Sequence, residues 1–141
     1  MKKLALYYSS DEQTPQIAKT KIKELNLKPD TLAEIRETKK RSKFNIMTSG
    51  RLEAMRQKKS EIEPLEVDLN EYGTIMIFMP LWGGNPAPAM NNIIEMIPKG
   101  KSVELYMTSA KGNSENSADN TSNEVQKRGS LVTKYVDLKI V

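Results

Sequence analysis

Short segments of strand-like character alternate with polar stretches along this chain, and this alternation limits the folds that it can adopt. The segments span residues 4–8, 31–35, 74–79, 103–107 and 131–141. Between them, apolar residues recur three or four positions apart, as Ala18, Ile22 and Leu25 do, which is typical of helices. Strands that alternate with helices form a parallel sheet, and right-handed crossovers make it the middle of three layers. The sequence therefore predicts an α/β sandwich.

Capping residues and helix breakers indicate where the other elements begin and end. Thr14 is expected to be the N-cap of a first helix, with Pro15 at its first helical position. A helix with a thin apolar stripe is expected over residues 51–59. Residues 80–88 contain three prolines and two glycines, so they are expected to form a loop. Further helices are expected around residues 90–97 and between 109 and 129.

Composition narrows the possible functions. The chain has 141 residues, and residues 1–141 are expected to form a single domain. The absence of Cys and His excludes disulfides, Cys/His zinc sites, thiol nucleophiles and histidine bases. A net charge of +4 is too mild to indicate a nucleic-acid partner. The apolar run at residues 4–8 is too short for a signal segment or a membrane span, so a cytoplasmic protein with no membrane partner is expected.

Three loops leave the carboxyl ends of the predicted strands, where open α/β sheets bind their ligands. Ser9, Ser10 and Thr14 lie at a strand-to-helix turn, where hydroxyls and a helix N-terminus are suited to hold a phosphate. Trp82, followed by two glycines, offers an aromatic face and a loop backbone that a planar ring can approach. The same residues also fit a capped turn and a packed surface tryptophan, so a purely structural role stays open. The loops span residues 9–14, 80–90 and 108–114.

The order of these loops resembles that of flavodoxins. Residues 4–18, LALYYSSDEQTPQIA, are similar to the first strand and phosphate turn of that family. Residues 71–94, EYGTIMIFMPLWGGNPAPAMNNII, are similar to its central strand and Trp-Gly loop, and a Thr-Ser loop follows at residues 108–114. The resemblance covers nearly the whole chain. It implies a flavodoxin-like sandwich with a five-stranded parallel sheet in the order 2-1-3-4-5, the cofactor FMN, and a role in electron transfer.

The resemblance also implies which residues contact the cofactor, and it implies neither a metal nor a catalytic side chain. Hydroxyls of the first loop would hold the phosphate, and Trp82 would stack on the flavin ring. The backbone of residues 83–85 would lie near the edge of the ring, and Ser109 and Gly112 would line its other side. The implied cofactor-binding residues are Ser9, Ser10, Gln13, Thr14, Pro80, Leu81, Trp82, Gly83, Gly84, Asn85, Ser109 and Gly112.

The phosphate turn departs from the family pattern. Asp11, Glu12 and Gln13 stand where the family has Thr-Gly-Asn, so two carboxylates would lie beside the phosphate and repel it. A glutamate at position 12 lacks the easy access of glycine to positive φ, and Pro15 removes one N–H group from the helix N-terminus. These changes argue against tight FMN binding.

Two features concern partners. The basic run Lys39 to Lys43, followed by Arg51, Arg56, Lys58 and Lys59, fits a solvated loop. It also fits docking of an acidic redox partner, or of the phosphates of a nicotinamide nucleotide. The flavodoxin fold normally has a helix after its fifth strand, and no such helix is expected here, so the first helix is expected to cover one sheet face alone. Apolar surface left over the third to fifth strands would be buried by a homodimer or a partner contact.

Three functions stay open from the sequence. The first is an FMN-binding electron-transfer protein, and the second is an NAD(P)H-dependent FMN or quinone reductase on the same fold. The third is a flavodoxin-like interaction domain that has lost FMN binding. The intact WGGNPAP loop at residues 82–88 favours the first two functions, whereas Asp11, Glu12 and the missing final helix favour the third.

Overall fold

Parallel strands form the centre of the computed structural model, which describes residues 1–9, 13–114 and 117–140. A two-residue strand, β4 (Asn85–Pro86), pairs antiparallel with the end of β3. The long strands are hydrogen-bonded in the order β2-β1-β3-β5-β6, which is the predicted order 2-1-3-4-5 when β4 is left out. The predicted α/β sheet is therefore confirmed. The long strands are β1 (Lys2–Tyr8), β2 (Thr31–Ile35), β3 (Tyr72–Trp82), β5 (Ser102–Ser109) and β6 (Leu131–Lys139).

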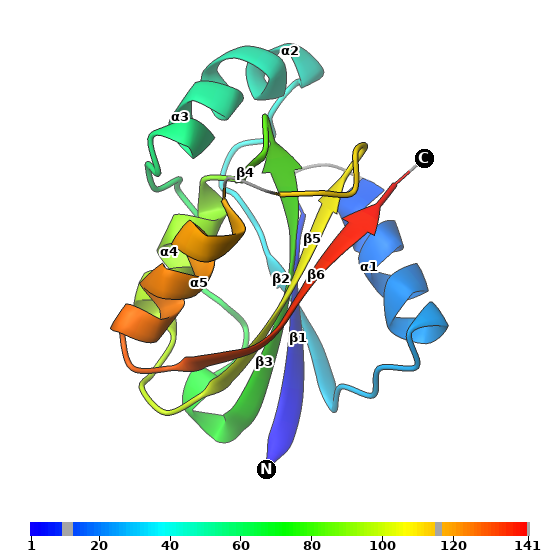
Figure 1. Cartoon of the computed structure of the whole chain (residues 1–141), viewed down its shortest axis with the longest axis vertical. Helices are drawn as coiled ribbons and strands as arrows, with labels where there is room; N and C mark the ends of the chain where they lie inside the picture. Colours follow the sequence, from blue (N-terminus) through cyan, green and yellow to red (C-terminus); the bar gives the residue numbers. More distant parts are fainter. Residues whose placement is uncertain (10–12, 115–116, 141) are drawn as a thin grey trace.

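Helices lie on both faces of the sheet (Figure 1). On one face lie α4 (Ala89–Met96) and α5 (Ala118–Lys127), and on the other lies α1 (Gln13–Glu24). A single 3-10 turn, Leu69–Glu71, precedes β3. Among the described residues, none of the helices has the length and apolar character needed to cross a bilayer.

A further helical group stands at the carboxyl ends of the strands (Figure 1). It consists of α2 (Lys43–Asn45), a π-helical turn (Ile46–Gly50) and α3 (Arg51–Met55). We call residues 38–60, which contain this group, the edge segment. The predicted helix over 51–59 was wrong at its end, because α3 stops at Met55, whereas its start at Arg51 agrees with α3. The helical group itself begins earlier, since the Oγ of Ser42 caps α2 by accepting from the N–H of Asn45 at 3.1 Å. The helix ends before Gln57, whose φ is 54°.

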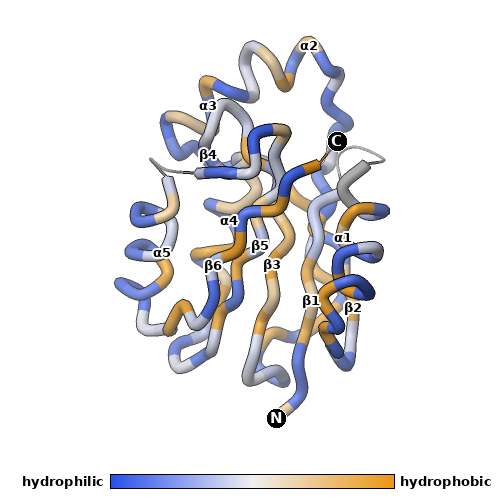
Figure 2. The backbone as a smooth tube through the Cα atoms, turned by 45° about the vertical axis from the view of Figure 1, so that its right-hand side comes forward, coloured by the Kyte–Doolittle hydropathy of each residue, from blue (hydrophilic) through white to orange (hydrophobic). Residues whose placement is uncertain are grey.

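Side chains that alternate along the strands build one core on each face of the sheet. Leu4 and Ile75 are fully buried on the α4 side, where they pack with Ile93. Ala5 and Met76 belong to the other core, which includes Ala18 of α1. Figure 2 shows hydrophobic residues gathered along the central strands, whereas hydrophilic and hydrophobic residues are mixed along the helices.

The sheet face beneath α1 differs from its prediction. The sequence predicts exposed apolar residues over the third to fifth strands, yet Phe78, Tyr106 and Leu138 are 0%, 1% and 7% exposed in the single chain. The rings of Phe78 and Tyr106 stack with centroids 4.7 Å apart. The homodimer was predicted because apolar sheet surface was expected to be exposed, and the structure removes that reason. The homodimer itself stays a prediction.

Two other boundaries differ from the sequence analysis. α1 begins at Gln13, so Thr14 lies inside the helix and the prediction of Thr14 as N-cap was wrong. β3 continues through Pro80, Leu81 and Trp82, which were expected to form a loop. This extension is possible because Pro80 still pairs with β5, while the last two residues of β3 pair with β4.

Candidate functional site

A cavity of about 520 Å³ opens at the carboxyl edge of the sheet, between the loop after β3 and the loop after β5. Four of the predicted cofactor-binding residues, Leu81, Gly83, Gly84 and Asn85, line one wall, and Ser109 lines the opposite wall. The fold thus brings two of the three predicted loops together. The remaining lining residues, which the sequence analysis missed, are Arg51, Ala110, Lys111, Asn113 and Ser114.

The first wall is a tight hairpin. Trp82 pairs with Asn85, so Gly83 and Gly84 form a two-residue hairpin turn, and the type I′ form of such a turn requires positive φ at both positions. Their φ values are 64° and 85°. A Cβ on Gly83 would lie 2.9 Å from the Nε of Arg51, whereas a Cβ on Gly84 would meet no heavy atom within 4 Å. Backbone is therefore the surface that Gly84 offers to the cavity.

The second wall is held by side-chain hydrogen bonds. The Oγ of Ser109 accepts from the N–H of Gly112 at 2.9 Å, and Gly112 has a φ of 72°. The buried Ser114 donates to a carboxylate oxygen of Asp137 at 2.6 Å, which leaves its Oγ to accept from the hydroxyl of Tyr135, also at 2.6 Å. Burial raises the pKa of Tyr135, which keeps this hydroxyl protonated as a donor. Ser114 could have been recognised as a residue of the site from its hydroxyl and its position in the loop at residues 108–114.

The predicted phosphate turn follows β1 at the same edge of the sheet. Ser9 is partly buried, and its hydroxyl donates to the carbonyl of Ile35 at 3.4 Å. Ser10, Asp11 and Glu12 lie outside the described residues, and so do the side chains of Gln13 and Thr14. The assignment of this turn to a phosphate therefore stays a prediction.

Trp82 is placed differently from the expectation of an open stacking surface. Its side chain is 5% exposed, and the edge of its ring meets Tyr8 at a centroid distance of 5.7 Å. The guanidinium carbon of Arg41 lies 5.2 Å from the ring centroid. A Cβ on Gly50 would lie 3.2 Å from two ring carbons, so only glycine fits there without a shift. The indole is thus covered by the edge segment.

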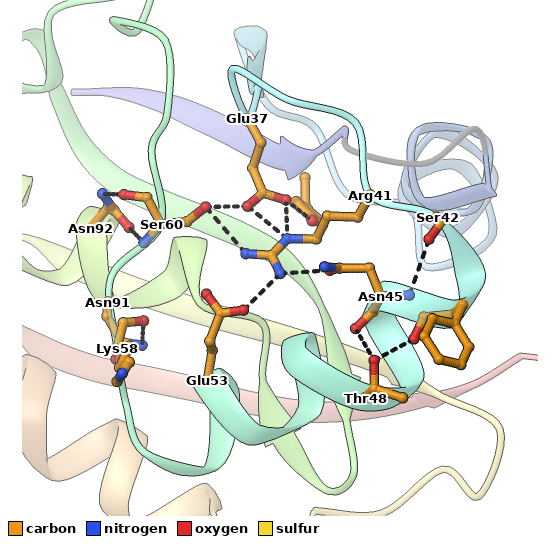
Figure 3. Close-up of polar contacts among 12 residues, drawn as sticks. Glu37, Arg41, Ser42, Asn45, Thr48, Glu53, Lys58, Ser60, Asn91 and Asn92 are labelled. Atoms are coloured by element: carbon orange, nitrogen blue, oxygen red, sulfur yellow. Dashed lines mark hydrogen bonds and ion pairs between the residues drawn. The ribbon is translucent and has the colours of Figure 1, made fainter.

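A buried ion pair fastens the edge segment (Figure 3). Its arginine, Arg41, is the residue that lies over Trp82. The Nε of Arg41 lies 3.0 Å from a carboxylate oxygen of Glu37, and the two side chains are 11% and 3% exposed. The Nη1 of Arg41 also binds Glu53 at 3.2 Å and the amide oxygen of Asn45 at 3.0 Å. Burial opposes the charge of Arg41, but the hydrogen bond to Glu53 and the charge of Glu37 outweigh it and raise the pKa of the guanidinium.

Further hydrogen bonds connect the edge segment to the rest of the fold, through the carboxylate of Glu37 and through the last residues of the segment (Figure 3). The hydroxyls of Tyr8 and Ser60 both donate to Glu37. The amide of Asn92 in α4 accepts from the N–H of Ser60 and donates to its carbonyl, each at 2.8 Å. Asn91 donates to the carbonyl of Lys58 at 3.0 Å. These polar contacts hold the edge segment in addition to the packing of Gly50 and Ala54 against the protein.

The structure divides the predicted basic run into two kinds of residue. Arg41 forms the buried ion pair with Glu37 and also pairs with Glu53, and its side chain is only 11% exposed. Lys39, Lys40 and Lys43 are exposed. A docking role for the run therefore concerns the three lysines and excludes the arginine between them.

Comparison with known proteins gives no matching family model and no matching curated protein. Solved structures do match. The flavoprotein from Lactobacillus acidophilus NCFM in complex with FMN is 23% identical, with a TM-score of 0.71 over 95% of this chain and 91% of that chain. Its apo-form, determined by NMR, is 24% identical with a TM-score of 0.63, covering 96% and 92%. A protein from Bacteroides eggerthii DSM 20697 assigned as a flavoprotein is 19% identical with a TM-score of 0.74, covering 96% and 86%.

These similarities agree with the strand order and the placement of the helices. The chain has a flavodoxin-like fold, as the sequence resemblance implied. Its candidate site lies at the carboxyl edge of the sheet, beside the point between β1 and β3 where the strand order reverses.

Proposed function

We propose that this protein binds FMN at the carboxyl edge of its sheet and carries electrons with it. The observation that carries the proposal is the cavity of about 520 Å³ between the loops that follow β3 and β5. Ligands of open α/β sheets bind beyond the carboxyl ends of the strands, near the reversal of strand order. The flavin ring would enter this cavity, and the phosphate would extend toward the turn after β1.

The walls of the cavity suit a flat ring. Gly83 and Gly84 expose peptide groups on one side, with open space beyond Gly84. Residues 109–114 form the other side, which Ser114 ties to β6. Arg51 and Lys111 add two cations that would offset the negative charge of FMN. Bound FMN would supply the electron-transfer chemistry, while the chain binds the ring, orients it and limits its contact with water.

The FMN complex of the flavoprotein from Lactobacillus acidophilus supports this proposal, because that protein is similar to this chain over 95% of its length. In this proposal Trp82 does not stack on the flavin ring, which was its predicted role. Buried below Arg41 and the π-helical turn, it would hold the edge segment against the end of β3, next to the cavity. The phosphate contacts of Ser9, Ser10, Gln13 and Thr14 remain part of the proposal.

Replacing Gly84 with valine is expected to weaken FMN binding by at least about tenfold, a change of about 1.4 kcal/mol. The new side chain would point into the cavity, and a β-branched residue is strained at a φ of 85°. The dissociation constant is measured from the quenching of FMN fluorescence.

Gly100→Val is the matched control for this variant. Gly100 has a φ of 82° and also has no heavy atom within 4 Å of a built Cβ, but it precedes β5 at the opposite end of the sheet. It should lose similar stability while keeping its FMN affinity. Equal FMN affinities for the two variants would contradict the proposed location.

A second candidate function is hydride transfer from NAD(P)H to the same flavin. It is favoured by a second cavity of about 590 Å³, since the lysines that help to line it are suited to nucleotide phosphates. These lysines are Lys39, Lys40 and Lys59. The carboxylates of Glu37, Glu53 and Glu61 also line this cavity, and Arg41 pairs with the first two. This function would be selected if the FMN-loaded protein oxidises NADPH and the variant Lys39→Glu/Lys40→Glu loses that oxidation. An FMN-loaded protein that exchanges electrons with a redox protein and leaves NADPH unoxidised would select electron transfer.

A further inference from the structure

The helical part of the edge segment has an unusual distribution of apolar residues. The side that packs on the protein carries Ile46, Gly50 and Ala54, at intervals of four residues, and Ala54 is 1% exposed. Apart from Ile46, the large apolar side chains of this part are exposed. The outward-facing residues, which we call the outer face, are Phe44, Met47, Leu52 and Met55, with exposures of 77%, 66%, 42% and 59%.

This arrangement is the reverse of an ordinary surface helix, whose large apolar residues face the core. Polar contacts of Arg41 and Ser60 hold the segment, so the outer face is not needed for that purpose. Exposed apolar groups gathered on one short element and bordered by charges are characteristic of an interaction site.

The charge around the outer face is strongly one-sided. Residues 38–60 contain eight basic residues and one acidic residue, whereas the rest of the chain contains fourteen basic and seventeen acidic residues. The net positive charge of the protein therefore lies in this segment. Arg41 is paired with Glu37 and Glu53, and Lys59 with Glu95. Within the described part of the chain, the other basic residues of the segment have no ion-pair partner: Lys39, Lys40, Lys43, Arg51, Arg56 and Lys58.

The outer face also lies beside the candidate cofactor cavity. Arg51, between Met47 and Leu52 in the helical group, lines that cavity directly. A protein bound to the outer face would therefore approach the group held in the cavity. Weak electron-transfer complexes use small interfaces, and an apolar centre with a charged rim is the usual anatomy of a protein interface.

We propose that the outer face and the lysines around it form the docking surface for an acidic redox protein. This inference rests on the proposed function, since it places the partner next to the flavin. Complementary charge would bring the acidic partner to Lys39, Lys40 and Lys43, and Phe44 with the flexible Met47 would pack against its apolar centre. An anionic membrane could also bind an apolar face surrounded by lysines. A position beside the cofactor cavity, however, is useful for electron exchange with a redox protein and has no use in membrane binding, so the protein partner is favoured.

The test uses a purified acidic [2Fe–2S] ferredoxin as the probe and the ¹⁵N-labelled full chain without added flavin, so its result does not depend on FMN binding. At about 20 mM NaCl, the amide signals of residues 38–60 are expected to shift or broaden, and the affinity should fall at least about tenfold at about 200 mM. Lys39→Glu/Lys40→Glu/Lys43→Glu should weaken binding at low salt by at least about tenfold.

A charge-matched control is Lys23→Glu/Lys28→Glu/Lys134→Glu, which reverses three exposed lysines outside the edge segment. This variant should bind within about threefold of the parent protein. The variant Phe44→Ser/Met47→Ser keeps the charge of the protein and should also weaken binding, because it removes apolar contacts with the partner. A purely electrostatic contact would leave the affinity of this variant unchanged.

Three results would overturn the proposal. They are the absence of shifts in residues 38–60 at low salt, an equal loss of affinity in the control variant, and sedimentation of the protein with phosphatidylserine vesicles in the absence of ferredoxin binding. The last result would assign the surface to a membrane. Failure of the FMN titration with intact ferredoxin binding would reject the proposed function and leave the docking surface standing.

Discussion

Replacement of Arg41 with alanine is expected to lower the free energy of unfolding by about 3–5 kcal/mol, because it leaves the carboxylate of Glu37 buried without its charge partner. Glu37 is 3% exposed and Arg41 is 11% exposed, so water cannot replace the lost contact well. The edge segment would also lose its contacts to Glu53 and Asn45. Urea unfolding measures the stability.

Arg36→Ala is the control for this prediction. Arg36 pairs with Glu34, but its side chain is 50% exposed, so the change should be within about 1 kcal/mol. Trp82 is the only tryptophan of the chain and lies under Arg41, so the emission of Arg41→Ala should shift to longer wavelength. An Arg41→Ala protein with parental stability and parental emission would contradict the account. Glu37→Gln/Arg41→Met should recover at least about 1 kcal/mol, since it removes both charges.

Replacement of Phe78 with alanine is the second large effect, with an expected loss of about 3–5 kcal/mol. Phe78 is 0% exposed and stacks on Tyr106, with an interplanar angle of 11°. The loss has a cavity term as well as a transfer term, because the sheet beneath cannot collapse to fill the space. Urea unfolding of both proteins at matched pH measures it.

The chain contains its own control, since its other phenylalanine, Phe44, is 77% exposed. Phe44→Ala should change stability by no more than about 0.5 kcal/mol. Phe78 is buried within one chain, so its effect should not depend on protein concentration. A loss that appears only at high concentration would show that this face is buried by a second copy, as the sequence analysis expected.

The strands could be predicted from the sequence because each is enriched in apolar or β-branched residues and lies between polar stretches. Residues 74–79 are the plainest case, and β3 indeed contains them. The end of β3 could not be predicted in the same way. Pro80 and the two glycines indicate a loop locally, but hairpin pairing with Asn85 and Pro86 extends the strand.

The edge segment resisted prediction for a different reason. An apolar stripe usually marks the buried side of a helix. The thin stripe predicted over residues 51–59 consists of Leu52 and Met55, but these side chains are 42% and 59% exposed. In the structure the small residues Gly50 and Ala54 face inward, because Gly50 lies against the ring of Trp82. The π-helical turn also changes the spacing of the outward residues.

Half of the candidate site followed from residue type and position, and half depended on contacts between distant segments. The glycines Gly83 and Gly84 were predicted because loops after parallel strands converge on one edge and a planar ring needs an accessible backbone, whereas Ser109 followed from the resemblance to flavodoxins. Arg51 could not be predicted there, because a separate helical group brings it to the hairpin. The cover over Trp82 likewise comes from Arg41, far from it in sequence.

The central claim is that FMN binds between the loops after β3 and β5, and an FMN titration of the ¹⁵N-labelled chain tests it most directly. The account predicts that the amide signals of residues 83–85 and 110–113 change first and most, with saturation, and that Gly84→Val reduces the change. Unchanged signals at a saturating concentration of FMN would contradict the account, as would changes confined to other parts of the chain.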